Sequence, residues 1–132
     1  MNLKKKLHLA QLEVYYGQLI NPKSPIYNIG GYVVLTGDLN KTLFKDVIGS
    51  LSSVFDTYNF KYDFKSEEPL FYIDKTAPVY LSELDFSLEK TSEEKAKEWM
   101  QEQMDTPFDL QKEKWFGHTL IKICLLYTSP SP

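Results

Sequence analysis

Stretches with helical spacing alternate with short apolar runs along this chain, which restricts it to a fold in which helices pack on a sheet. Apolar residues recur every three or four positions in three stretches: 9–20, 41 to about 58, and 92 to about 104. Strand-like patterns occupy four others: 27–36, 70–73, 79–86 and 114–123. The predicted order is helix, strand, helix, strand, strand, helix, strand, which is an α/β (α+β) two-layer fold.

The same periodicity predicts which residues face the core. In the first helix one face carries Leu9, Leu12, Tyr16 and Leu19. The second has a predicted buried stripe of Leu43, Phe44, Val47, Ile48, Leu51 and Val54, and the third buries Ala96, Trp99, Met100 and Met104. Asn40 is a predicted helix cap, and Thr91 with Glu94 predicts a capping box. The strand over 27–36 is apolar on both faces, so we expect it to be covered on both sides.

Composition excludes several classes of function. The net charge is −3, and this acidic balance without a basic stripe argues against a nucleic-acid binder. All fifteen basic residues are lysines. No apolar run approaches the roughly 20 residues of a membrane span. Polar residues interrupt the stretch after Lys4–Lys6, which excludes a signal peptide. We therefore predict a cytoplasmic protein without a membrane or nucleic-acid partner. The single cysteine, Cys124, excludes an intrachain disulfide framework and a cysteine-based zinc site.

Few residues suggest chemistry by themselves. The chain has no glycine-rich phosphate loop, no Gly-x-Ser-x-Gly and no His-Glu-x-x-His. We expect His8 at the surface and His118 half-buried and hydrogen-bonded, because neither has a nucleophile beside it. Glu67-Glu68 and Glu93-Glu94 are interpreted as a solvated loop and a helix start, since adjacent carboxylates do not face one another. We predict no catalytic, cofactor-binding or metal-binding residue.

Several segments do match a known pattern in order and spacing. Leu9–Tyr16 follows Ser-x-Ala-Gln-x-Arg-Leu-Trp at Ala10, Gln11 and the aromatic Tyr15. The others are Pro22–Ile29, which follows Pro-x-Ser-x-x-Tyr-Asn-Ile; Leu35–Asn40, which follows Leu-x-Gly-x-Leu-Asp; Asp85-Phe86-Ser87; and Pro107-Phe108-Asp109-Leu110. Together they resemble the condensation domains of nonribosomal peptide synthetases, members of the chloramphenicol-acetyltransferase-like superfamily. The resemblance covers nearly all of residues 7–123.

This resemblance implies a fold and a function. The fold would be one incomplete lobe of a pseudodimer, with a mixed sheet covered by helices. The parent protein would form amide bonds between aminoacyl or peptidyl thioesters, carried on the phosphopantetheine of carrier proteins. Its partners would be those carrier domains and the missing remainder of the condensation domain. Ester-forming and epimerising relatives share the same front half.

Departures from the family pattern leave a second interpretation open. The second family motif, His-Glu-x-Leu-Arg, falls on residues 55–59, where Phe55 replaces the histidine and Asn59 the arginine. In the family that arginine is taken to pair with the aspartate of the catalytic motif. Lys114 and Gly117 replace a proline and an arginine after Pro-Phe-Asp-Leu. The catalytic motif, His-His-x-x-x-Asp-Gly, does not occur, so the resemblance assigns no catalytic residue here. A degenerate, inactive relative is the alternative.

The last nine residues, CLLYTSPSP, match the translation of a transposase sequencing adapter. One further adapter base completes the codon for Ile123. We therefore expect residues 1–123 to be a partial N-terminal lobe of a condensation domain and 124–132 to be an adapter-derived tail that is not native. Such a lobe should have poor solubility or fold only partially by itself. The rival reading is a natural tail on a complete small non-catalytic interaction module.

Overall fold

The computed structural model describes residues 3–112 and 115–124. Its elements follow in the order β1 (Lys5–Lys6), α1 (Leu9–Ile20), α2 (Lys41–Gly49), α3 (Leu51–Val54), the 3-10 helix η1 (Asp56–Asn59), β2 (Phe60–Asp63), β3 (Leu70–Ile73), β4 (Leu81–Asp85), α4 (Ser92–Asp105) and β5 (His118–Lys122). Apart from Cys124, the predicted adapter tail lies outside the described residues, as does Lys114.

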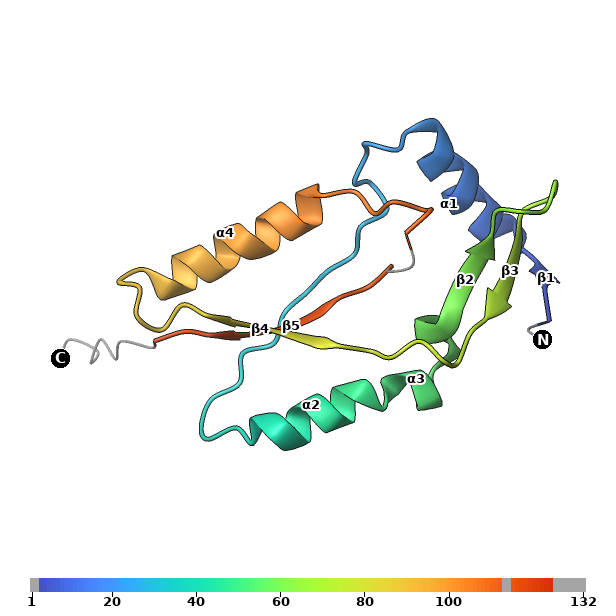
Figure 1. Cartoon of the computed structure of the whole chain (residues 1–132). Helices are drawn as coiled ribbons and strands as arrows, with labels where there is room; N and C mark the ends of the chain where they lie inside the picture. Colours follow the sequence, from blue (N-terminus) through green and yellow to red (C-terminus); the bar gives the residue numbers. More distant parts are fainter. Residues whose placement is uncertain (1–2, 113–114, 125–132) are drawn as a thin grey trace.

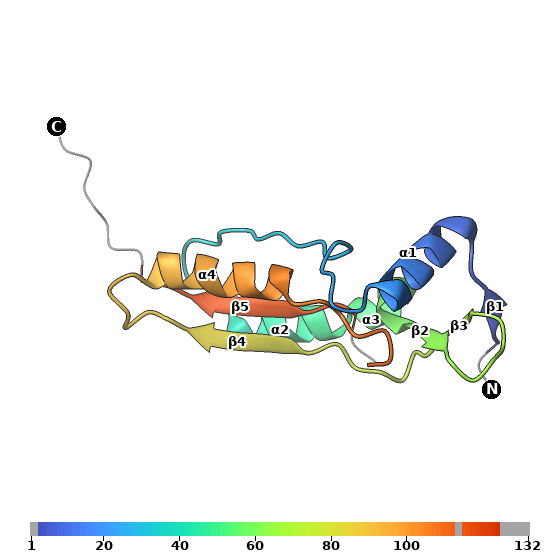
Figure 2. The same ribbon diagram turned by 90° about the horizontal axis from the view of Figure 1, so that it is seen from above.

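The described strands form two separate sheets. An antiparallel sheet has the order β1-β3-β2, and β4 pairs in parallel with β5, with Leu81 opposite His118. Helices α4 and α2 lie on opposite faces of the β4–β5 pair, and α1 lies beside the antiparallel sheet (Figures 1 and 2). The predicted class, helices layered on strands with both kinds of pairing, is confirmed.

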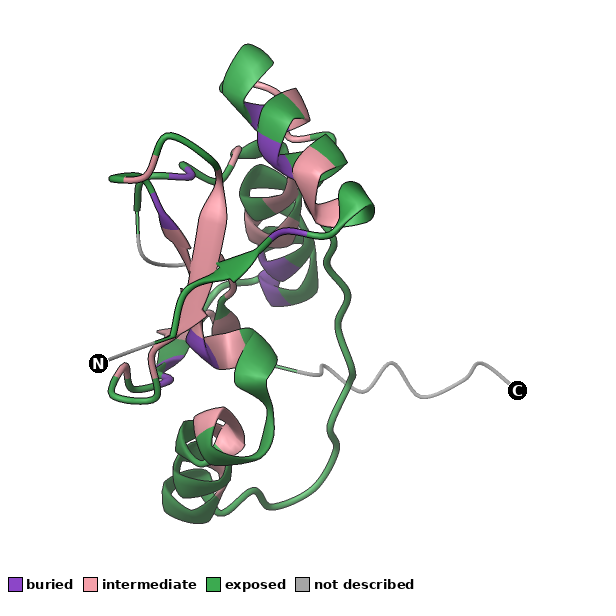
Figure 3. Cartoon of the chain, turned by 90° about the vertical axis from the view of Figure 1, so that its right-hand side faces the viewer, coloured by how far each residue is buried: buried purple, intermediate pink, exposed green. Residues whose placement is uncertain are grey.

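A small core lies between α1 and the antiparallel sheet. Leu7, Tyr15 and Leu110 are buried there, and aromatic rings from the sheet pack against them. The Phe60 and Phe71 rings stack with centroids 4.7 Å apart, and the Tyr15 and Tyr62 centroids are 5.0 Å apart. Most of the remaining residues are exposed or half-buried (Figure 3). Three further apolar residues are buried outside this cluster: Val79 and Leu81 at the start of β4, and Ala96 on α4.

The predicted strand over 27–36 is wrong. Residues 28–36 are extended but pair with no other strand in the described part of the chain, and residues 29–36 are all exposed. The segment joins α1 to α2; it passes the C-terminal end of α4 and crosses the β4–β5 pair in the view of Figure 1. A strand needs a neighbour to bond its backbone groups, and none lies beside this segment in the described structure. The prediction that this segment is covered on both faces is therefore also wrong, since residues 29–36 are exposed.

The helix predicted from 41 to about 58 is interrupted. It ends at Gly49, and α3 and η1 follow as separate short turns. Asn40 is the N-cap, because its Oδ1 accepts a hydrogen bond from the Leu43 amide at 3.0 Å. The predicted buried stripe is wrong: α2 and α3 contain no buried residue, and Leu43, Val47 and Val54 are more than half exposed.

Two further predictions about helix surfaces are wrong. Helix α1 buries Tyr15 and Gln18 rather than the predicted face, of which Leu9, Tyr16 and Leu19 are exposed. Thr91 is the N-cap of α4 but makes no side-chain capping bond. The buried hydroxyl at this turn belongs to Ser92, whose Oγ lies 3.1 Å from both the amide nitrogen and the carbonyl oxygen of Cys124.

Candidate functional site

Asn28 joins two of the motif segments that are far apart in sequence. Its Nδ2 donates hydrogen bonds to the carbonyl oxygens of Met104 at 2.8 Å and Thr106 at 2.7 Å. These carbonyls end α4 directly before the Pro107–Leu110 segment, so the side chain fixes one motif against the other. One amide with two N–H groups satisfies two carbonyls left open by the helix end.

Two glycines near this junction lie against side chains of other elements. A Cβ on Gly17 would come close to the Tyr27 hydroxyl, and a Cβ on Gly30 would meet the Met104 sulfur at 2.5 Å. The 22–25 turn is fixed by the buried Gln18, whose Nε2 lies within 3.2–3.4 Å of the carbonyl oxygens of Asn21, Pro22 and Ser24. Helices α1 and α4 therefore both position the segment that resembles Pro-x-Ser-x-x-Tyr-Asn-Ile.

The second family motif folds around η1 and the start of β5. The Tyr58 hydroxyl and His118 Nε2 are 3.0 Å apart, and the Phe116 ring packs edge-on to Tyr58 with centroids 4.7 Å apart. The prediction that His118 is half-buried and hydrogen-bonded is confirmed. Sequence reasoning did not identify Tyr58 as its partner, since the two residues are separated by 60 positions.

Asn59 occupies the position of the family's arginine and is fully buried, with 0% exposure. Its side-chain Nδ2 donates to the Ser52 backbone carbonyl oxygen at 2.6 Å, and its backbone carbonyl oxygen accepts from the Asp74 backbone amide at 2.7 Å. The Oδ1 atom has no hydrogen-bond partner in the structure. Asn59 therefore connects α3 to the strand β3 and its loop, and offers no positive charge to an aspartate.

The remaining charged candidates behave as predicted. His8 is exposed, Glu68 forms an exposed ion pair with Lys6 at 3.3 Å, and Glu93 pairs with Lys97 along α4 at 2.9 Å. Among the described residues no group of three His, Cys, Asp or Glu side chains is placed to hold a metal ion. No helix in that part of the chain is long and apolar enough to cross a membrane.

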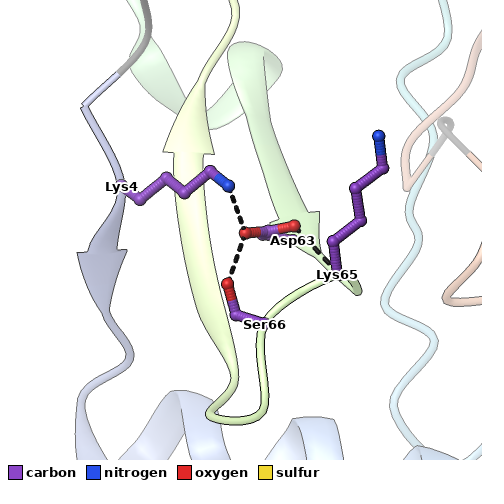
Figure 4. Close-up of polar contacts among 4 residues, drawn as sticks. All are labelled: Lys4, Asp63, Lys65 and Ser66. Atoms are coloured by element: carbon purple, nitrogen blue, oxygen red, sulfur yellow. Dashed lines mark hydrogen bonds and ion pairs between the residues drawn. The ribbon is translucent and has the colours of Figure 1, made fainter.

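One carboxylate is held by an unusually complete set of donors. Asp63 accepts hydrogen bonds from the Lys65 amide at 3.0 Å and the Ser66 hydroxyl at 2.8 Å, and forms an ion pair with Lys4 at 2.7 Å (Figure 4). The bond from Lys4, followed by those from Lys65 and Ser66, lowers the pKa of Asp63 to about 2. The cluster anchors the segment containing β1 to the turn after β2, and we assign it a structural role.

Apolar side chains form an extensive open surface on the rest of the molecule. The largest contributions come from the extended segment and α2: Ile26, Ile29, Tyr32, Val33, Val34, Leu35, Leu43 and Val47 are each at least half exposed. We call residues 26–35 together with Leu43 and Val47 the open face. A compact monomer rarely exposes so many large apolar residues in two adjoining elements.

Comparison with known proteins identifies the class. The family model described as "Condensation domain" matches residues 4–124. This chain therefore belongs to the condensation-domain family, which confirms the resemblance of its motifs.

Two curated relatives are nonribosomal peptide or lipopeptide synthases. The chain is 26% identical over 119 residues to a dimodular nonribosomal peptide synthase of Bacillus subtilis, covering 90% of this chain and 5% of that protein. It is 29% identical over 126 residues to an isonitrile lipopeptide synthase of Streptomyces coeruleorubidus, covering 93% of this chain and 8% of the relative. The chain thus spans a small part of each synthase.

Solved structures share the fold. The starter condensation domain of the rhizomide synthetase RzmA matches with a TM-score of 0.86 at 24% identity, covering 93% of this chain and 31% of that one. The first condensation domain of the calcium-dependent antibiotic synthetase matches with a TM-score of 0.77 at 18% identity, covering 92% and 31%. The chain therefore has the fold of about a third of a solved condensation domain.

Proposed function

We propose that this chain forms part of the N-terminal lobe of a condensation domain, and that the longer protein joins two carrier-bound thioesters by an amide bond. The observation that carries this proposal is the open face, taken together with the family match. Its large apolar residues are exposed in two elements that follow one another in sequence, on a chain that matches 31% of a solved condensation domain. The remainder of such a domain is the occupant that fits it.

The total surface supports an incomplete core. The chain exposes 10708 Å². A compact monomer of 15.4 kDa would expose roughly 7,200 Å². Even if the twelve residues outside the described part were fully extended and added roughly 2,000 Å², about 1,500 Å² of excess would remain. An excess of that size is larger than the roughly 800 Å² that each partner buries in a standard interface.

The proposed reaction needs groups that lie outside this sequence. An amine on one carrier-bound substrate attacks the thioester carbonyl carbon of the other. The nitrogen–carbon bond forms, the carbon–sulfur bond breaks, and the proton lost by the amine is taken up by the released thiolate. A histidine of the His-His-x-x-x-Asp-Gly motif would orient or deprotonate the amine. We infer that this chain supplies scaffold, that phosphopantetheine-bearing carrier domains are its partners, and that it acts in the cytoplasm.

A degenerate, non-catalytic condensation domain is the second candidate. The observation that favours it is Asn59, whose side chain is neutral, fully buried and directed to Ser52 at the position where the family has arginine. Without that cation, an aspartate of the catalytic motif would lose its partner.

The test uses a protein in which this chain is continued through its whole condensation domain from the source DNA. It is mixed with two carrier proteins, one loaded with a donor thioester and the other with an acceptor, and the products are identified by mass spectrometry. The proposal predicts a dipeptidyl thioester on the acceptor carrier, abolished when the second motif histidine is changed to alanine. A folded protein that binds the loaded carriers without forming product would support the degenerate candidate instead.

A further inference from the structure

A hollow of about 200 Å³ lies between the β2–β3 hairpin and the segment that follows α4. The aromatic rings of Tyr62, Tyr72 and Trp115 line it, together with the buried Leu110. The Trp115 indole packs edge-on to the Tyr62 ring, with centroids 4.9 Å apart. No residue of the open face takes part. Since sites for drug-sized ligands measure roughly 300–1,000 Å³, this hollow suits a smaller molecule.

The charged side chains around the hollow favour an anion. Asp63 lines it, but the donors described above already hold that carboxylate, and the Lys65 ammonium extends away from it (Figure 4). Lys61 also lines the hollow and forms an ion pair with Asp74 at 3.5 Å. Lys65 and Lys112 are exposed, and neither side chain forms an ion pair with another described residue. These two ammonium groups leave the described lining with a surplus of positive charge.

A buried hydrogen-bond donor in the lining also lacks a partner. The Trp115 Nε1 atom is buried and donates no hydrogen bond to a described residue. Buried N–H groups are normally paired, and the aromatic face of Tyr62 beside it is at most a weak acceptor. Because Trp115 lines the hollow, an acceptor on a bound molecule would supply the missing partner. A carboxylate oxygen is a strong acceptor of this kind.

We infer that the hollow binds a small aromatic carboxylate. The ring of the ligand packs among the side chains of Tyr62, Tyr72 and Trp115, since aromatic pairs favour edge-to-face and offset contacts. Its carboxylate accepts the indole N–H and faces the ammonium groups of Lys65 and Lys112. The inference does not rest on the proposed function, because the residues that carry it lie outside the open face.

Titration of the whole chain with benzoate, followed by proton–nitrogen NMR, tests the site. The chain has two tryptophans, so Trp99→Phe identifies the indole N–H signal of Trp115. We expect that signal to shift with benzoate and to saturate. Benzamide has nearly the same shape without the charge, and inorganic phosphate has charge without the ring. Each should bind about tenfold or more weakly than benzoate, because each lacks one of the two kinds of contact.

Substitution of the two lysines tests the charge of the site. Lys65→Gln combined with Lys112→Gln should weaken benzoate binding about tenfold or more. Lys45→Gln combined with Lys90→Gln is the matched control, because it removes the same charge outside the hollow and should leave the affinity unaltered. All four lysines are exposed, so the NMR spectra of both double variants should show an unchanged fold. A Trp115 signal that does not saturate up to tens of millimolar benzoate overturns the inference, as does equal affinity for benzamide or for the two double variants.

Discussion

Replacing Asn28 by aspartate should turn a hydrogen-bond donor at the end of α4 into an acceptor, while the size and shape of the side chain stay almost the same. The Asn28 amide donates to Met104 and Thr106, whereas an ionised carboxylate can only accept hydrogen bonds. The carboxylate would also lie at the C-terminus of α4, where the helix dipole disfavours negative charge. Both effects lower the free energy of unfolding.

The magnitude follows from the two bonds. Each neutral hydrogen bond contributes about 1 kcal/mol net, so Asn28→Ala should cost about 1–2 kcal/mol. Asn28→Asp should cost about 1 kcal/mol more at pH 7, because of the dipole and the repulsion from two carbonyl oxygens. With an m-value of about 2 kcal/mol/M, the urea midpoint of the aspartate variant should fall by roughly 1 M.

Urea unfolding, followed by tryptophan fluorescence, measures this change. Asn21→Asp is the matched control: it puts the same charge at the C-cap of α1, where the cap's hydrogen bond comes from the backbone N–H of Asn21 and not from its side chain. The carbonyl oxygens favour the protonated acid at position 28, so its folded pKa lies above the usual value of about 3.9. Its deficit relative to alanine should therefore shrink as the pH falls through that raised folded pKa, and it should level off below about pH 4. If the two aspartate variants have the same midpoint at pH 7, the reasoning about Asn28 is refuted.

Two other predictions concern packing and acid stability. Gly49→Ala should raise the free energy of unfolding by up to about 1 kcal/mol, because the new Cβ would make only ordinary contacts. Gly17→Ala should give no such increase, because its Cβ would clash with the Tyr27 hydroxyl. The thermal midpoints of the two variants compare these effects, and equal increases would contradict the Gly17 contact. The folded pKa of Asp63 is about 2, below its ordinary value of 3.8, so the stability it contributes is complete above about pH 4 and is lost as the pH falls toward 2. Acid titration of the wild type and Asp63→Asn should show their stabilities converging over that window, and a constant difference would argue against the Lys4 contact.

Local patterns predicted the helices well where an element depends mainly on its own residues. The helical spacing predicted α1 over 9–20 and α4 from 92 to about 104, and the structure places them at Leu9–Ile20 and Ser92–Asp105. The buried face of α1 was harder, because Tyr15 and Gln18 are buried through contacts that other segments provide. Periodicity identifies an apolar stripe, but tertiary neighbours decide which stripe is covered.

Strands depended more on partners than on their own residues. The 27–36 pattern was strongly strand-like, yet no neighbour pairs with it in the described structure. In contrast β2 was missed, although Phe60 and Tyr62 alternate with the polar Lys61 and Asp63 and would have revealed it. The two-residue strand β1 has no comparable signal, since it consists of two exposed lysines.

The site was predictable only as a set of motif segments. Their order indicated the family, which the comparison confirms, but not that Asn28 meets the end of α4 across 76–78 positions. Likewise, Asn59 was recognised as a departure from the family, while its complete burial and its bond to Ser52 required the structure. Contacts between distant segments follow from chain topology, which local patterns do not contain.

Sequencing the source DNA beyond the codon for Ile123 tests the central claim most directly. If this chain is part of a condensation domain, the native reading frame should continue past that codon and soon encode His-His-x-x-x-Asp-Gly. If the codons for residues 124–132 are genomic and a stop codon follows Pro132, the chain is instead a complete module, and the account of its open face as an interface within a longer domain is contradicted.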